Sequence, residues 1–458
     1  MSNSKGIFQE MLIVTILFVL ICLIYKGQQR VSYNEGKGWD GVYYYEMSQQ
    51  FQQGTFPVAG RLPFIKRIGV PFLVGYFSRI TGITILDSAL IINLIGFYII
   101  VILSLLWMRI FIGDRWIRLL LLFLLMMAWY VHLRECFFNP QGTDNWGTVW
   151  FLAGLLALNR MRENYYRCNN FKIVDVLFFS IIVGVGIFFR ETNSILALAP
   201  FFLLNPLSAL KISLITISSK NLAHLINRTW RLYFTKKILI LALPILMILI
   251  ANAIVSGLIL VSDQFKYSYL TAACKTFYNK SLPEYMLGIF NAYGPIIVLL
   301  PFFWKHFKPI LIERQELLFL LIVSFFMGYV GAGGTERITF MSGFPIMFLL
   351  IAVSIRGIFY SGQRWWLFVL LFLQTIAHRY YWGVPDFPNE ISNTPIPFFT
   401  LPGTKFQFLY LYSGYGSFMV NTVLFLEYIV LCVISIYVLF NKVEFKWPIL
   451  RNCLKNNG

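Results

Sequence analysis

The sequence predicts an all-α polytopic membrane protein, and three observations lead to this fold class. The chain of 458 residues is 58% hydrophobic and only 13% charged, whereas a soluble chain carries about a quarter charged residues. Its mean hydropathy is +0.69. Apolar runs long enough to cross a bilayer recur along its whole length. We therefore expect a single transmembrane domain over residues 1–458, with most of the chain in spans.

About 10–12 transmembrane helices are expected, because a helix needs roughly 20 apolar residues to cross the hydrocarbon core. The candidate runs are 8–26, 84–112, 116–133, 145–161, 173–189, 192–206, 237–262, 286–304, 316–332, 338–356, 364–378 and 419–441. The fifth and sixth are short and divided by Arg190-Glu191, so one broken helix is the alternative there. The first run is read as a retained span, because no small-x-small cleavage site follows it.

The charge of the loops predicts the orientation. With the N-terminus on the cytoplasmic side, most of the 38 Lys and Arg residues fall on inner segments. The net charge of +18 then follows from the positive-inside rule, and no nucleic-acid partner is needed. The inner segment 207–237 carries six basic residues and no acid, so we expect it to lie on anionic membrane lipids. Both termini should be cytoplasmic, in a plasma (inner) membrane.

The first outer loop, residues 27–83, holds the densest polar motif of the chain. Trp39-Asp40-Gly41 leads directly into three tyrosines, of which Tyr44 is the second. A cluster of cations follows: Arg61, Lys66 and Arg67. Asp40 can take a proton or hold a metal, and the cations can hold an anion. The alternative is a solvated loop with aromatic residues at the headgroup level.

A short helix is expected within this loop, over residues 67–82. The segment is apolar but too short to span, and Pro71 lies near its start. Such a segment suits a helix that lies in the membrane interface. Its N-terminus beside Lys66 and Arg67 would attract phosphate, because unpaired N–H groups point out of a helix start.

Three more polar motifs fall on the same face. Asp144 precedes a span, Arg190-Glu191 lies between two apolar stretches, and Glu336-Arg337 follows a glycine-rich turn. Charges next to apolar stretches are costly unless paired, which makes them functional candidates. The structural alternatives are a helix cap for Asp144, a local ion pair for Arg190-Glu191, and a tight turn with a snorkelling side chain for Arg337.

The late outer loop, residues 379–418, is rich in aromatic residues and prolines, so it could cover the site or stack on sugar rings. The six Cys and four His residues form no spaced ligand set. No metal site or cofactor is therefore predicted. A divalent metal at Asp40 or Asp144 is left open.

The order of these motifs resembles the membrane-embedded GT-C glycosyltransferases of bacteria, in particular the protein mannosyltransferase and lipid A aminoarabinose transferase group. The resemblance covers roughly residues 1–350. It implies an outward-facing cavity and a sugar donor carried on a polyprenyl phosphate. It also implies that an acidic residue of the first outer loop is catalytic, and by position this is Asp40. Many members carry a second acid directly after the first, where this chain has Gly41.

The expected function is inverting sugar transfer from a polyprenyl-phosphate-linked donor to a lipid or glycan acceptor at the extracytoplasmic face, in cell-envelope synthesis. Asp40 would take the proton of the acceptor. The other members of the expected site bind substrate: Tyr44, Arg61, Lys66, Arg67, Asp144, Arg190, Glu191, Glu336 and Arg337. One alternative is a many-span polysaccharide polymerase that uses loop 379–418. Weaker alternatives are a lipid or sugar transporter, which predicts charges deep in the spans, and a structural scaffold.

Overall fold

The computed structural model describes residues 2–128, 132–168, 170–204, 236–261, 268–331, 334–360, 364–378 and 422–442. The expected late outer loop at 379–418 and most of the basic inner segment at 207–237 lie outside these residues.

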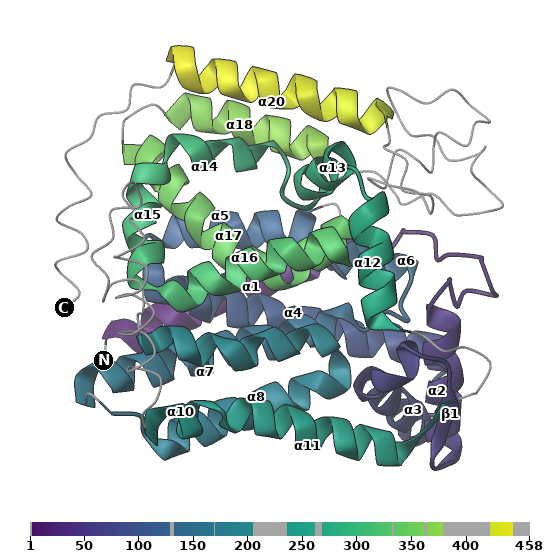
Figure 1. Ribbon diagram of the computed structural model, residues 1–458. Helices are drawn as coiled ribbons and strands as arrows, with labels where there is room; N and C mark the ends of the chain where they lie inside the picture. The colour runs from purple at the N-terminus through teal and green to yellow at the C-terminus, as the bar shows by residue number, and fades with distance from the viewer. Residues whose placement is uncertain are drawn as a thin grey trace.

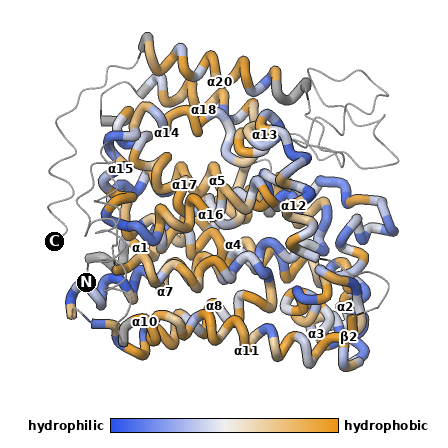
Figure 2. Tube along the Cα trace, viewed as in Figure 1, coloured by the Kyte–Doolittle hydropathy of each residue, from blue (hydrophilic) through white to orange (hydrophobic). Residues whose placement is uncertain are grey.

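Most of the helices lie side by side, as the fold class predicts (Figure 1). Hydrophobic residues fill the middle of the bundle, and hydrophilic residues gather at its two ends (Figure 2). Within the described residues, four helices are long and apolar enough to cross a membrane, or five if a bent pair counts as one span. Five shorter apolar helices accompany them. The chain is therefore an integral membrane protein with many apolar helices.

Each predicted run contains a helix. In chain order the bundle helices are α1 (Ser2–Tyr25), α4 (Ile85–Phe111), α5 (Arg115–Met127), α7 (Asp144–Cys168), α8 (Ile173–Phe189), η2 (Glu191–Leu204), α10 (Lys236–Leu241), α11 (Leu243–Leu258), α15 (Trp304–Glu313), α16 (Gln315–Val330), α17 (Thr335–Tyr360), α18 (Arg364–Ala377) and α20 (Thr422–Lys442). Arg190 alone separates α8 from η2, which begins at Glu191, so the fifth and sixth runs are two elements.

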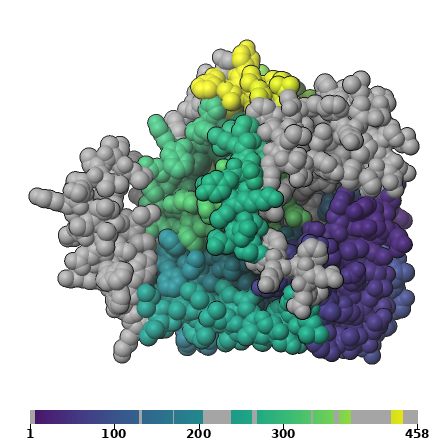
Figure 3. Space-filling model, turned by 45° about the vertical axis from the view of Figure 1, so that its right-hand side comes forward, coloured from purple at the N-terminus to yellow at the C-terminus, as the bar shows by residue number. Residues whose placement is uncertain are grey.

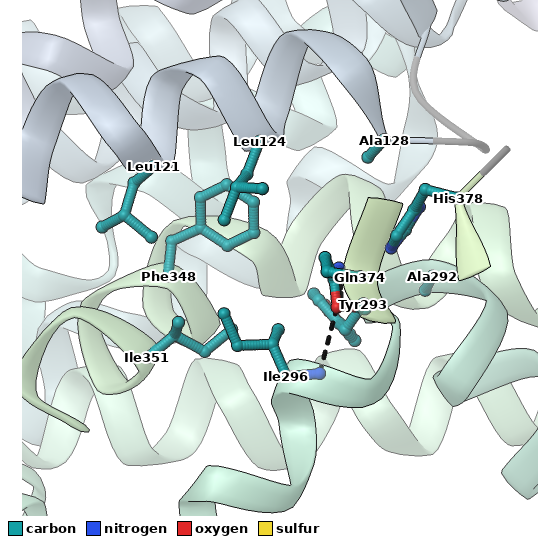
Figure 4. A pocket seen from close by; sticks show the side chains of 10 residues that line it. All are labelled: Leu121, Leu124, Ala128, Ala292, Tyr293, Ile296, Phe348, Ile351, Gln374 and His378. Carbon is teal, nitrogen blue, oxygen red and sulfur yellow. Dashed lines mark hydrogen bonds between the residues drawn. The ribbon is translucent and has the colours of Figure 1, made fainter. Parts of the chain in front are cut away.

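The run 286–304 is not one straight span, which corrects the expectation. It consists of α13 (Leu282–Tyr293), η4 (Pro295–Val298) and α14 (Leu299–Phe302), with a bend of 106°. The bend falls at Gly294, whose φ of +71° suits glycine, and Pro295 cannot continue the α13 ladder. Gln374 of α18 replaces lost backbone hydrogen bonds there (Figure 4). Its Nε2 donates to the Tyr293 carbonyl at 2.7 Å, and its Oε1 accepts from the Ile296 amide at 3.0 Å.

The end of the bundle that carries the first outer loop is called the outer end here. Its elements are α2 (Gly41–Gln53), β1 (Val58–Gly60), η1 (Phe64–Lys66), α3 (Gly69–Thr81), α6 (His132–Phe138), β2 (Ile259–Val261) and α12 (Tyr269–Asn279). α3 confirms the helix predicted over residues 67–82, while its place in the membrane interface stays a prediction.

The first outer loop is a folded unit attached to α11. β1 pairs in parallel with β2, which follows α11 directly. An apolar cluster joins the same parts, with Met47 and Phe51 of α2 packed together with Val255 and Ile259. Figure 3 shows this unit in purple next to the teal helix. The loop that carries Asp40 is thereby held in a fixed place at the outer end.

Candidate functional site

Asp144 lies between two arginines at the outer end. It is the first residue of α7, and its side chain is 12% exposed. Arg190, which caps the C-terminus of α8, approaches Oδ1 with Nη2 at 2.8 Å and also donates to Thr143 Oγ1 at 3.2 Å. Arg337, in the first turn of α17, approaches Oδ2 with Nε at 3.5 Å. Three helices thus meet at one carboxylate, which was expected as a site residue.

The two arginines differ in exposure. The side chain of Arg190 is 6% exposed, whereas that of Arg337 is 41% exposed. A guanidinium has five donors in a planar fork that suits the oxygens of a phosphate or carboxylate. Arg337 is therefore the more accessible arginine of this group.

Arg67 and Glu191 form a second ion pair beside the first. Arg67 Nε donates to Glu191 Oε2 at 2.8 Å, and Nη2 contacts Oε1, so the pair is bidentate. Arg67 Nη1 also donates to the Tyr44 hydroxyl at 2.8 Å. Burial alone would lower the pKa of the Arg67 guanidinium, but Tyr44 and Glu191 together raise this pKa well above its ordinary value. Arg67 is therefore a fixed cation that ties the first outer loop to the start of η2.

The charges of the two ion pairs affect one another. Burial lowers the pKa of Arg190, and the nearby charge of Arg67 lowers it further, while Asp144 and Glu191 act in the opposite direction. Arg190 and Glu191 are neighbours in sequence, yet the described ion pairs join each of them to a distant residue. The local ion pair that was the alternative interpretation of this motif is replaced by two pairs between separate elements.

Asp40 is half-buried at the start of α2 and makes no capping hydrogen bond. The glycines on both sides of it pack against the loop before Asp144. A Cβ on Gly38 would lie 2.8 Å from Asn139 Oδ1, and a Cβ on Gly41 would lie 2.7 Å from Gln141 Cβ. The segment that carries Asp40 therefore contacts the loop that carries Asp144. It also follows that a second acid at position 41 has no room.

Arg61 and Lys66 lie within the same folded unit. Arg61 Nη1 donates to the Tyr43 hydroxyl at 2.8 Å, and its guanidinium lies 5.6 Å from the centre of that ring. Lys66 ends η1, directly before Arg67. Arg61 thus has a structural partner in the first outer loop, and the substrate-binding role of both residues stays a prediction.

Glu336 is fully buried at the start of α17. Its Oε2 would lie 3.4 Å from a Cβ on Gly288 of α13, so α13 and the first turn of α17 are in close contact there. Glu336 therefore lies on the inward side of α17, whereas its neighbour Arg337 extends to Asp144.

Glu135 is an acidic group near the site that was not singled out in the sequence. It lies on α6, in the loop that leads to Asp144. Burial raises the pKa of this carboxyl to about 7; Asp144 raises it as well, and Arg337 lowers it. An acid that titrates near neutral pH, close to an ionised acid and an arginine, is a pattern typical of functional sites. The sequence signal that could have identified Glu135 was its place in the same short loop as Asp144.

A divalent metal does not fit the donor groups of this site as they lie. The described residues contain no group of three or more His, Cys, Asp or Glu side chains that could hold one. Both oxygens of Asp144 are engaged by arginines. No step of the proposed reaction is therefore assigned to a metal.

Comparison with known proteins gives structural likeness only. No protein-family model matches the sequence, and no curated protein gives a significant match. The chain is similar in structure to the oligosaccharyltransferase of Archaeoglobus fulgidus in a complex with Zn and sulfate, with a TM-score of 0.48 and 13% identity over 82% of this chain and 54% of that one.

A second structure of this archaeal enzyme is similar to the same degree. In a complex with an inhibitory peptide and a dolichol-phosphate, it gives a TM-score of 0.45 and 12% identity over 92% of this chain and 56% of that one. The chain thus spans just over half the length of these neighbours. At such low scores the likeness does not assign a family, so the function is argued from the site itself.

Proposed function

We propose that the protein is a membrane glycosyltransferase of the GT-C type. It would transfer a sugar from a polyprenyl-phosphate-linked donor to a lipid or glycan acceptor at the extracytoplasmic face, in cell-envelope glycan or glycolipid synthesis. The observation that carries the proposal is the group at Asp144, where a half-exposed arginine lies at the outer end of an apolar bundle. A lipid phosphate needs this combination of a cation and an apolar surface for its chain.

The three arginines would have different roles in binding the donor. Arg337 binds the phosphate, because its guanidinium is accessible and its forked donors suit phosphate oxygens. Arg190 and Arg67 are buried and already paired, so they contribute positive potential rather than direct contacts. This is narrower than the expectation from the sequence, in which all three arginines bind substrate.

Asp40 would act as the general base. It takes the proton of the acceptor hydroxyl as that oxygen forms a bond to the anomeric carbon. The bond between the anomeric carbon and the phosphate oxygen breaks, and its electron pair stays on the lipid phosphate beside Arg337. A single displacement of this kind inverts the anomeric carbon. Glu191 holds Arg67 in place, and Asp144 holds Arg190 and Arg337.

The test is transfer by the purified full-length protein in liposomes that contain a radiolabelled polyprenyl-phosphate sugar and total lipid acceptor. The proposal expects a labelled product with the wild type and loss of at least about 100-fold in rate with Asp40→Asn, the size of a missing general base. Wild-type transfer by this variant would exclude Asp40 as the base. Failure of the protein to bind any polyprenyl phosphate would exclude the proposed class.

A further inference from the structure

Lys280 is a buried cation outside the group at Asp144. It lies between α12 and α13, and the whole residue is only 3% exposed. Its ammonium group donates to the carbonyls of Gly328 and Gly331, each at 3.0 Å, and to Thr335 Oγ1 at 2.8 Å. A buried ammonium needs all three of its donors satisfied, and here they are.

These three acceptors connect two helices that lead to the site. Gly328 and Gly331 lie at the C-terminus of α16, where backbone carbonyls have no partner in the helix and favour a cation. Thr335 is the first residue of α17. One side chain therefore fixes both ends of the turn that joins α16 to α17. Arg337 follows two residues later, in the same first turn of α17.

Two carboxyl groups, those of Glu284 and Glu336, act electrostatically on the ammonium of Lys280. Burial lowers the pKa of Lys280, while Glu284 and Glu336 both act to raise it. Glu284 is itself only 3% exposed, and Glu336 is fully buried. Loss of the ammonium would leave these two acids without their nearby cation, and an unbalanced buried charge is costly.

Close packing makes this arrangement rigid. A Cβ on Gly288 of α13 would come within 2.6 Å of Thr335 Cγ2, so α13 lies directly against the start of α17. The Tyr329 hydroxyl of α16 donates to the Lys280 carbonyl at 3.2 Å, which joins the same two segments a second time. The first turn of α17 is therefore set by α13, α16 and Lys280 together.

We propose that Lys280 is a positioning residue of the phosphate site: its ammonium fixes the turn between α16 and α17 and thereby places Arg337 against Asp144. This inference rests on the proposed function, in which Arg337 binds the donor phosphate. Lys280 acts through Arg337 and has no contact of its own with the donor. Its removal therefore weakens phosphate binding only while Arg337 is present.

The test measures binding of undecaprenyl monophosphate to the full-length protein in nanodiscs. Arg337→Gln is expected to weaken binding about 10-fold, the loss of one charge-assisted contact. Lys280→Met should weaken it by a similar factor, and the double variant should bind no more weakly than Arg337→Gln alone. Lys280→Arg should recover part of the affinity. Lys275→Met, which removes an exposed charge from the preceding helix α12, is the matched control and should bind as the wild type does.

A milder variant tests the same role of Lys280 with less risk of unfolding the protein. Thr335→Val keeps the shape of the side chain but removes one acceptor of Lys280, so a smaller weakening that also vanishes in the Arg337→Gln background is expected. Wild-type affinity of both Lys280→Met and Thr335→Val, or losses that add to that of Arg337→Gln, would overturn the role of Lys280 and leave the proposed function standing. Wild-type affinity of Arg337→Gln would instead remove the phosphate site itself, and the inference with it.

Discussion

Two groups of one acid and two arginines lie in the bundle, one at the outer end and one at the opposite end, which is called the inner end. At the inner end, Glu10 of α1 holds Arg109 at 3.1 Å and also binds Arg118, and all three side chains are buried or nearly so. At the outer end, Asp144 holds Arg190 and Arg337, but Arg337 is 41% exposed. The inner group is closed and joins α1, α4 and α5. The outer group has one arginine that is accessible to solvent, and the proposal places the donor phosphate there.

This difference indicates that two buried arginines paired with one acid do not by themselves form a binding site. At the inner end the side chains of Arg109 and Arg118 are only 18% and 6% exposed, so a ligand has little access to them, and the cost of desolvation is offset within the group. At the outer end one guanidinium is exposed to solvent, and the proposal assigns ligand binding to this group for that reason. The difference predicts that variants at the inner end alter stability, whereas variants at the outer end alter binding and transfer.

The largest effect is expected outside both groups, at Asp40. Asp40→Asn keeps the size of the side chain but cannot take a proton, so transfer should fall roughly 10²- to 10⁴-fold. Binding of undecaprenyl monophosphate should stay near the wild-type level, because the amide leaves the arginines in place. The measurement pairs a transfer rate with a dissociation constant. Equal losses in both would mean that Asp40 shapes the donor site instead of acting as a base.

The inner group should dominate stability. Glu10→Gln leaves two buried arginines without their carboxylate and should destabilise the fold by about 3–5 kcal/mol. Thermal unfolding in detergent measures the loss. Donor affinity at a temperature where the variant is folded should be unchanged. A weakened donor affinity without a lower melting temperature would contradict the closed, structural role of this group.

A smaller effect is expected where Tyr44 contacts Arg67. Tyr44→Phe removes one hydrogen bond to a buried cation and should cost roughly 1.5–3 kcal/mol of stability. Arg67 keeps its bidentate pair with Glu191, so donor affinity should change little. Chemical unfolding and phosphate binding check the two parts separately. A loss of affinity as large as that of Arg337→Gln would show that Arg67 contacts the donor directly.

The smallest effect concerns pH and Glu135. Its pKa of about 7 lies above the ordinary 4.5, so the folded state favours the neutral form. The fold therefore loses stability as pH rises from about 4.5 through 7. Over the same upper range the new negative charge beside Arg337 should weaken phosphate binding about 3-fold. Glu135→Gln stays neutral and should flatten both trends. Binding curves at several pH values, compared with the wild type, measure this difference, and identical profiles would mean that Glu135 does not titrate near the site.

Much of the fold could be predicted because the sequence signals for helices are local. A helix is found in each hydrophobic run of sufficient length, and segment 67–82 was predicted as a helix from its short length and Pro71, whereas α2, α6 and α12 were not predicted. The bend at Gly294 was missed, because its stability depends on Gln374 of a distant helix. A change in chain direction inside an apolar run has no strong signal in one sequence.

The candidate site residues were easier to select from the sequence than their contacts, and their roles stay a prediction. The outer motifs were found because charges next to apolar runs are conspicuous, and a local ion pair of Arg190 with Glu191 was the structural alternative there. Long-range contacts decided otherwise, with Asp144 and Arg67 as the partners. Lys280 was missed because two of its three acceptors are backbone carbonyls, which no side-chain pattern reveals.

The most direct test of the account compares the two groups by matched variants. Undecaprenyl monophosphate binding is measured in nanodiscs for the wild type, Arg337→Gln and Arg109→Gln, each of which loses one arginine from a group of one acid and two arginines. The account predicts about 10-fold weaker binding for Arg337→Gln and unchanged affinity for Arg109→Gln, whose melting temperature alone should fall. Wild-type affinity of Arg337→Gln, or an equal loss in Arg109→Gln, would contradict it.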